Sequence, residues 1–302
     1  MDPETVEVSD GIYAYIQPDG SWYINNTGFL VGSHGATSID TCSTERRTRA
    51  YLAAVAAVTP RPVRTLINTH HHGDHTYGNW LLPEATIVAH ARCRDEVLAA
   101  GPPANRGVFD EVEWGAVEVT PPFLTYQTGV TLWVDDLRCD VRHVGTPAHT
   151  TNDSVIHIPD RSVLFAGDLL FNGGTPFLLM GSVSGAIEAL EQVVRPLGAQ
   201  TIIPGHGPVC GPGVIDDVLG YLRFTERVAR EGKAAGLTPL EAARQADLGD
   251  YAALTDAERI VGNLHRAYFE LAGGDRGAPI DIVAALTDMV AYNGGRPLTC
   301  HA

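Results

Sequence analysis

Short apolar runs broken by turns fill the first two thirds of the chain, and helical spacing of apolar residues dominates the last third. Runs rich in β-branched and aromatic residues predict strands. They are IYAYIQ, WYINNTGFLVG, GATSID, RTLINT, TIVAH, VTLWVD, LRCDVRHV, SVIHIP, SVLFAGD and TIIPGHG. Helices are predicted at 43–58, 91–100 and 183–194, and the Gly- and Pro-rich residues 101–126 predict a long surface loop. Because the strands come in two runs with helices outside them, we predict an α/β body of two stacked sheets.

Beyond about residue 210, four segments carry the apolar period of amphipathic helices. They are VLGYLRFTERVAREGKAAG, PLEAARQAD, DAERIVGNLHRAYFELAG and PIDIVAALTDMVAYNGG. In the third segment, Ile260, Leu264 and Tyr268 fall on one helical face. We therefore predict a catalytic domain at 1–210 and a helical region at 211–302 that packs on it and contributes to the substrate pocket.

The composition is that of an acidic globular protein. The chain has 302 residues, is 44% hydrophobic and carries a formal net charge of −15. This charge disfavours nucleic acid and anionic membranes as partners, and no apolar run approaches the roughly 18 residues of a membrane-spanning helix. The N-terminal MDPETVEVSD is too polar for a secretory signal. Five scattered cysteines without a C-x-x-C pair suit a reducing compartment, so we predict a cytoplasmic protein that binds neither nucleic acid nor membrane.

The segment NTHHHGDHTYGN places four histidines and an aspartate in the six positions HHHGDH. His70 and His72 lie two apart at the end of a predicted strand, so their side chains point to one side and His71 points to the other. The glycine that follows permits a turn, after which Asp74 and His75 begin a helix. Imidazole and carboxylate groups suit zinc or iron. We predict that this cluster binds metal and that His71 has a structural role.

One cluster supplies too few ligands for two metal ions, so further His or Asp residues are expected at later strand ends. His149 follows a strand in GTPAHTTND, Asp168 ends a strand in LFAGDLL, and His206 ends the last strand in IIPGHG. A carboxylate can bridge two cations because its two oxygens accept independently. The predicted ligands of one ion are His70, His72 and His149, and those of the other are Asp74, His75 and His206, with Asp168 and a water between the ions.

The series HHHGDH, AHT, GD and GHG, in this order over roughly residues 8–210, resembles the metallo-β-lactamase superfamily. The resemblance implies a four-layer αββα sandwich with two Zn²⁺ ions as cofactors, to which this chain adds a C-terminal helical appendage. It also implies that Asp40 in SIDT orients a metal ligand and does not itself bind metal. With an aspartate at position 168, the chain resembles the hydrolase branches of this superfamily and not the β-lactamases, which carry a cysteine there. His72, in place of a carboxylate, weighs against the di-iron flavoprotein branch.

Two metal ions would acidify water and polarise a carbonyl oxygen. Both effects suit hydrolysis of an ester, thioester, lactone or amide, and both suit stabilisation of the enolate of an aldol reaction. Asp168 between the ions and Asp74, whose second oxygen need not bind metal, are the predicted catalytic residues, with Asp74 moving a proton. The metal-binding residues therefore leave the reaction open.

Apolar residues near the cluster predict a substrate pocket. The tip GSWYIN overhangs the metals in similar proteins, and the segment DLLFNGGTPFLLMGS is unusually apolar for a loop beside a metal site. These side chains either line a pocket for a flat aromatic or polyketone substrate or pack against the next helix. The candidates are Trp22, Tyr23, Phe171, Phe177, Leu178, Met180 and, on a C-terminal helix, His265.

Over nearly its full length, the chain resembles the second-ring cyclases of aromatic type II polyketide pathways, the actinorhodin type. The segments that carry this resemblance are NTHHHGDHTYGN, GTPAHTTNDSV, TPFLLMGSVSG, VGNLHRAY and AYNGGRPLTCHA. It implies an aromatic polyketide intermediate as substrate, closed by intramolecular aldol condensation and dehydration, with thioester hydrolysis releasing the product from acyl carrier protein. The alternatives are a stand-alone metallo-hydrolase of small thioesters or lactones and a non-catalytic, metal-stabilised scaffold that binds a carrier protein. Formation of a homo-oligomer stays open.

Overall fold

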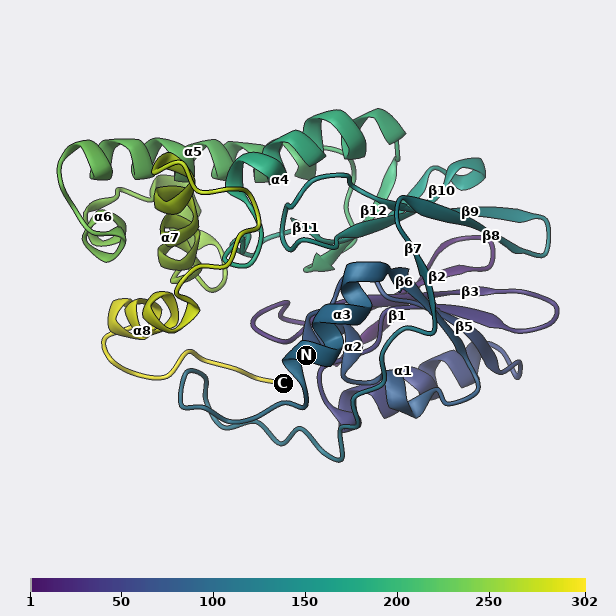
Figure 1. Ribbon diagram of the computed structural model, residues 1–302. Helices are drawn as coiled ribbons and strands as arrows, with labels where there is room; N and C mark the ends of the chain where they lie inside the picture. Colours follow the sequence, from purple (N-terminus) through teal and green to yellow (C-terminus); the bar gives the residue numbers. More distant parts are fainter. Residues whose placement is uncertain (1) are drawn as a thin grey trace.

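The computed structural model describes residues 2–302, which fold into two β-sheets stacked between helices (Figure 1). The first sheet has the strand order β1-β2-β3-β4-β5-β6-β7. Its strands are β1 (Glu4–Ser9), β2 (Ile12–Ile16), β3 (Thr27–Val31), β4 (Ala36–Ile39), β5 (Val63–Ile67), β6 (Thr86–His90) and β7 (Leu124–Tyr126). The second sheet has the order β12-β11-β10-β9-β8. Its strands are β8 (Gly129–Val134), β9 (Leu137–His143), β10 (Ser154–Ile158), β11 (Val163–Phe171) and β12 (Thr201–His206).

The inner faces of the two sheets share one buried hydrophobic cluster. Ile12, Leu30 and Ile67 of the first sheet belong to the same cluster as Val141 and Phe165 of the second, and none of the five is more than 2% exposed. Alternate residues along a strand point to opposite faces, so each strand can offer one apolar row to this core. Burial of both inner faces holds the sheets together.

Helices cover the outer faces of both sheets and complete the predicted four-layer αββα sandwich, which is confirmed (Figure 1). They are α1 (Glu45–Val58) and α3 (Ala91–Ala100) on the first sheet, and α4 (Val183–Ala189) and α5 (Val214–Ala234) on the second. Thr44 caps α1 by accepting a hydrogen bond from the backbone N–H of Arg47, and Tyr51 of this helix packs in a cluster with Phe29 of β3. The helix predicted at 183–194 is α-helical to Ala189 and continues as a π-helical turn.

The strand predicted from WYINNTGFLVG is too long at its N-terminal end, because β3 begins only at Thr27. The side-chain amide of Asn25 donates to the carbonyl of Thr41 at 2.8 Å. The amide of Asn26 donates to the carbonyl of Pro204 at 3.0 Å and also to that of Gly207. These buried side chains bond to main-chain groups and so fix an irregular segment.

The predicted C-terminal helices are present as α5, α6 (Pro239–Gln245), α7 (Arg259–Leu271) and α8 (Ile282–Tyr292). One buried cluster contains Leu164 of β11, Leu222 of α5 and Leu264 of α7, so these helices share a core with the second sheet. The domain boundary near residue 210 stays a prediction. Within residues 2–302, no helix combines the length and the apolar character needed to cross a bilayer.

Residues 101–123 contain no helix or strand and form most of the long loop predicted at 101–126, whose last three residues are instead the strand β7. Phe109 forms an isolated bridge with Leu298, and the N–H of Asp110 donates to the carbonyl of Leu298 at 2.9 Å. Figure 1 shows this loop beside the C-terminal segment. Two segments nearly 200 positions apart in the sequence (109 and 298) therefore lie together next to the sandwich.

Candidate metal centre

Strand ends and the loops that follow them bring the predicted ligands to one edge of the sandwich. Residues 70–75 follow β5, and their second half forms the short helix α2 (Gly73–Thr76). His149 lies in the connection between β9 and β10, while Asp168 is part of β11 and His206 ends its neighbour β12. Because β11 and β12 run parallel, the two side chains emerge near the same edge.

The structure brings all seven predicted ligands into two groups of four, with one residue shared. In each group, one potential ligand atom per residue lies within 4.8 Å of all the others. The first group is His70, His72, His149 and Asp168, and the second is Asp74, His75, Asp168 and His206. Asp168 is the shared residue, so its carboxylate occupies the position of a bridge between two ions.

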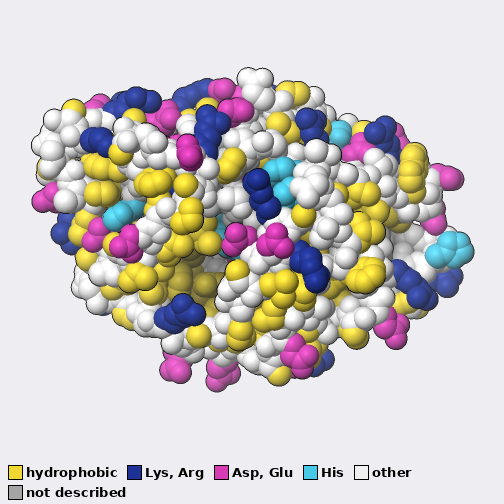
Figure 2. Space-filling view, viewed as in Figure 1, with side chains coloured by type: hydrophobic (Ala, Val, Ile, Leu, Met, Phe, Trp, Pro, Cys, Tyr) yellow, Lys and Arg dark blue, Asp and Glu magenta, His cyan; other side chains and the backbone are white. Residues whose placement is uncertain are grey.

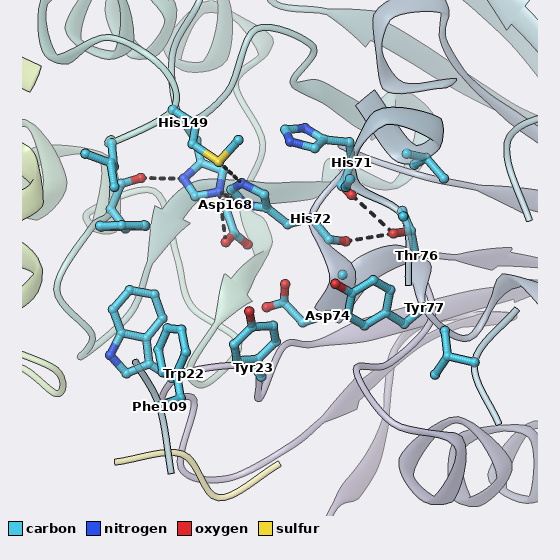
Figure 3. Close-up of a pocket in the computed structure, with 18 of the residues that line it drawn as sticks. Trp22, Tyr23, His71, His72, Asp74, Thr76, Tyr77, Phe109, His149 and Asp168 are labelled. Carbon is cyan, nitrogen blue, oxygen red and sulfur yellow. Dashed lines mark hydrogen bonds and ion pairs between the residues drawn. The ribbon is translucent and has the colours of Figure 1, made fainter. Parts of the chain in front are cut away.

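Distances place the Asp168 carboxylate at the middle of the cluster. Its Oδ2 lies 3.3 Å from His149 Nε2 and 3.3 Å from His206 Nε2. Its Oδ1 lies 3.1 Å from His75 Nε2. On the other side of the second group, Asp74 Oδ2 lies 3.3 Å from His206 Nε2. Imidazole nitrogens of both groups thus face the Asp168 carboxylate. Figure 3 shows His149, Asp168 and Asp74 around one space.

The unpaired atoms of the cluster show that it suits cations. His70 Nε2, His75 Nε2 and Asp168 Oδ1 are buried and have no hydrogen-bond partner among the residues described. His75 Nε2 and Asp168 Oδ1 lie 3.1 Å apart, yet neither has a hydrogen-bond partner in the described part of the chain. Buried polar atoms of a folded protein are normally paired. A donor set of imidazole and carboxylate groups fits two zinc ions at these positions.

The outward nitrogens of the same histidines are fixed by hydrogen bonds. His206 Nδ1 lies 3.1 Å from the carbonyl of Gly20, and His149 Nδ1 bonds to the carbonyl of Phe177. His75 Nδ1 lies 2.8 Å from Asp40 Oδ2. Such contacts orient an imidazole and leave its other nitrogen free to bind metal.

The carboxylates attract positive charge to the centre. Burial disfavours a charged His206, but Asp168 and Asp74 outweigh burial and raise the pKa of His206 to about 9. Burial likewise opposes a charged His75, yet Asp168, Asp74 and Asp40 raise its pKa well above the usual range. In return, His206 and His75 overcome the effect of burial and hold the pKa of Asp168 well below that of an ordinary aspartate.

Burial favours the neutral form of all three consecutive histidines, which for His70 and His72 is the form that binds metal. Burial lowers the pKa of His70 and of His72 well below the usual range. Burial also lowers the pKa of His71 to about 4. His71 belongs to neither group of four, and its Nδ1 lies 3.0 Å from the side-chain nitrogen of Asn152. Its ring nevertheless reaches the pocket beside the centre.

Asp40 lies behind the centre and belongs to neither group of four. Its Oδ1 accepts a hydrogen bond from the Thr69 N–H at 2.7 Å, and its Oδ2 lies 2.7 Å from Thr69 Oγ1 and 2.8 Å from His75 Nδ1. One carboxylate therefore holds both a metal-facing imidazole and the main chain just before the histidine cluster. These contacts agree with the orienting role that the sequence suggests for Asp40.

We expect Asp40→Asn to weaken zinc binding by about 10- to 100-fold, because the imidazole of His75 loses its carboxylate partner. Zinc affinity is measured by competition with a chromophoric chelator, and circular dichroism checks that the variant is folded. The control is Asp160→Asn, which changes an exposed aspartate on a surface turn. Unchanged zinc affinity in folded Asp40→Asn would contradict the orienting role.

A cavity of about 240 Å³ opens beside the centre, and Figure 2 shows a hollow on this face bordered by hydrophobic side chains. Five of the predicted pocket residues line it, namely Trp22, Tyr23, Phe171, Phe177 and Met180. Leu178 and His265 do not. Leu178 is buried in the core, and His265 Nε2 lies 2.8 Å from Asp288 Oδ2, where it joins α7 to α8.

Several residues that line the pocket were not predicted from the sequence. Tyr77 lies three positions after Asp74, so helical spacing alone places it on the same side. Phe109 comes from the irregular loop, and Leu286 comes from α8. Buried Arg259 lies with its guanidinium 4.1 Å from the ring centre of Trp22 and donates to the Thr175 carbonyl at 2.9 Å. No periodic signal in the sequence points to Phe109 or Arg259.

Comparisons with known proteins give one family and one fold. The family model described as "Metallo-beta-lactamase superfamily" matches residues 20–206. "Acyl-coenzyme A thioesterase MBLAC2" of Homo sapiens is 26% identical over 162 residues, 46% of this chain and 54% of that protein. "Hydroxyacylglutathione hydrolase" of Nitrosococcus oceani is 31% identical over 150 residues, 48% of each chain. The chain thus spans about half the length of these curated relatives.

A solved structure shows the same fold at low sequence identity. The metallo-beta-lactamase from Pontibacter korlensis superimposes with a TM-score of 0.60 and 19% identity, covering 73% of this chain and 99% of that one. At this identity the likeness concerns the fold alone. The share of this chain left outside the superposition is consistent with a common sandwich to which further segments are added.

Proposed function

The chain belongs to the metallo-beta-lactamase superfamily, and we propose that it is a zinc-dependent hydrolase of acyl thioesters with an apolar acyl group. The observation that carries the proposal is the pair of buried His/Asp groups sharing Asp168, beside a pocket lined by Trp22, Phe109 and Phe177. Two relatives support the reaction type, since their names describe a thioesterase and a hydrolase of an acylated glutathione.

Bound zinc would supply a Lewis acid for the thioester carbonyl and lower the pKa of water. Six histidines and aspartates would hold the ions around the shared carboxylate of Asp168. Both ion pairs of Asp74 use its Oδ2, so we assign proton transfer to Oδ1, which would take a proton from water and pass it to the departing thiolate, which leaves as the thiol. The carboxylate of Asp74 lines the pocket and can reach a bound substrate (Figure 3).

A second candidate is the aldol cyclisation and dehydration of an aromatic polyketide intermediate, bound to acyl carrier protein or released from it. The aromatic wall favours it. Trp22 meets Phe109 and Phe177 edge to face, with ring centres 5.1 and 4.9 Å apart, and all three aromatic residues line the pocket. The names of the two relatives describe thioester chemistry and mention no polyketide. We therefore favour thioester hydrolysis over cyclisation.

The test is to incubate zinc-loaded protein with an aryl-acyl coenzyme A, S-lactoylglutathione and a first-ring-cyclised polyketide thioester. Thiol release is followed by colour and the products by mass, with chelator-treated protein as the control. We expect thiol release from the aryl-acyl thioester that depends on zinc. Loss of water together with thiol from the polyketide would support the cyclase. Neither thiol nor water from any substrate would overturn the proposed function.

A further inference from the structure

Two tyrosine hydroxyl groups face the pocket beside the metal centre. Tyr23 belongs to the irregular connection between β2 and β3, and Tyr77 follows α2 directly. Both residues line the same cavity as Asp74. Figure 3 shows the two rings on either side of the Asp74 carboxylate, with both phenol oxygens directed to the space that this carboxylate faces.

The rings are held in place by aromatic neighbours. Tyr23 meets Phe109 and Trp114 edge to face at 5.3 and 5.0 Å between ring centres, and Tyr77 meets Trp114 at 5.8 Å. The ring of Tyr77 also lies so close over Gly73 that a Cβ there would overlap it. Each hydroxyl therefore has a defined position before any ligand arrives.

The backbone of Tyr23 indicates a functional constraint. Its φ is +62°, in the left-handed region that favours glycine. A bulky residue keeps such a conformation only when its surroundings impose it, and such residues cluster at binding and catalytic sites. Glycine would adopt the same φ without strain, so the side chain itself needs an explanation.

Neither phenol oxygen has a hydrogen-bond partner in the part of the chain that the structure describes (Figure 3). Two other polar side chains of the pocket have partners, although Arg259 Nε is buried without one among residues 2–302. Thr76 Oγ1 donates to the His72 carbonyl at 3.0 Å, and Arg259 is bonded to the Thr175 carbonyl and paired with Asp256. The two phenols are thus donors that remain available to a ligand.

Both phenols act as donors because they stay protonated. A tyrosine hydroxyl ordinarily loses its proton only near a pH of about 10, so both phenols carry their proton at neutral pH. A neutral phenol can donate its O–H to a carbonyl oxygen.

We propose that Tyr23 and Tyr77 bind a second oxygen of the acyl group and make the enzyme selective for 3-oxoacyl thioesters over plain acyl thioesters. The inference rests on the proposed thioesterase function. The thioester carbonyl reacts at the metal centre, and the two tyrosine hydroxyls flank Asp74 of that centre. The acyl oxygen that the tyrosines bind must therefore lie close to the oxygen of the thioester carbonyl. A ketone at position 3 is an oxygen only two carbons along the chain from the thioester carbonyl. A plain acyl chain would leave both donors unpaired in an apolar pocket, which disfavours it.

The test compares zinc-loaded wild type, Tyr23→Phe and Tyr77→Phe on a matched pair, a 3-oxoacyl thioester and the plain acyl thioester of equal length. Phenylalanine removes only the oxygen and keeps the ring contacts. We expect wild type to prefer the 3-oxo substrate in kcat/KM, and each variant to lower that preference by about 3- to 10-fold. Tyr251→Phe is the matched control, because Tyr251 packs against Tyr221 and Phe224 away from this pocket and should leave the preference unchanged.

A binding measurement separates this inference from the proposed function. The ligands are a keto thioether, in which CH2 replaces the thioester carbonyl, and the same thioether without the ketone. Tighter binding of the keto compound by wild type, lost in both phenylalanine variants, supports the two-donor site even if no thioester is hydrolysed. Equal binding of the two compounds by wild type, or a preference that both variants retain, overturns it.

Discussion

Replacing Asp168 with alanine should lower kcat/KM for thioester hydrolysis by at least on the order of 10³-fold and reduce bound zinc. Asp168 is the one carboxylate that both groups of four share, and its oxygens lie within 3.3 Å of three imidazole nitrogens, those of His75, His149 and His206. Its loss removes a negative charge that a pair of dications requires. Without this charge, several kcal/mol of transition-state stabilisation by the metals would be lost. A loss of that order corresponds to the expected decrease in kcat/KM on the order of 10³-fold.

Zinc content by atomic absorption and kcat/KM on the preferred thioester are measured on the same sample of Asp168→Ala. Asp160→Ala, which removes an exposed carboxylate at the turn before β11, should keep both values near wild type. A thermal melt identifies a variant that is merely unfolded. Folded Asp168→Ala with full zinc content and activity would contradict a shared carboxylate at the heart of the reaction.

The ligand set could be predicted from the sequence because strand ends place residues with little freedom. An apolar strand fixes where its last residue lies, and strands of one sheet end at a common edge. His206 ends its strand and His149 follows one, as predicted, whereas Asp168 lies inside β11 and not at its end. The chemistry and order of these residues were still sufficient to anticipate the two groups that the structure assembles. The layers of the fold followed from the same strands, since two runs of them must bury two apolar faces.

The pocket wall could be predicted only in part, because it depends on contacts between distant segments. Phe109 reaches the cavity on a loop that is anchored by Leu298 of the C-terminal segment, and neither segment has a periodic pattern. His265 fails as a pocket residue for a related reason. Its helical face was evident, but the sequence did not reveal that α8 would supply Asp288 as its partner. Loops and helix packing are decided by tertiary contacts that local sequence does not encode.

Gly205→Ala should disrupt the centre almost as strongly as loss of a ligand, although the residue binds nothing. Gly205 lies in β12, beside the strand that carries Asp168. A Cβ at this position would overlap Asp168 Oδ1 and would lie 2.8 Å from the carbonyl carbon of Gly167 and 2.9 Å from the Asp168 nitrogen. Since two of these atoms are backbone, the strand itself would have to move. Overpacking of this kind destabilises a fold by about 1–3 kcal/mol.

The displaced carboxylate should lower kcat/KM by about 10²-fold, because misplacement of a catalytic group by about 1 Å has an effect of this size. Zinc content, urea unfolding and kcat/KM are measured together. Gly213→Ala is the matched control, since this glycine precedes α5 with φ −58° and a Cβ there meets no atom within 4 Å. It should behave like wild type. Equal activity and stability in the two alanine variants would show that β11 and β12 can separate at the centre, and that the close approach of the strands is not what holds the Asp168 carboxylate in place.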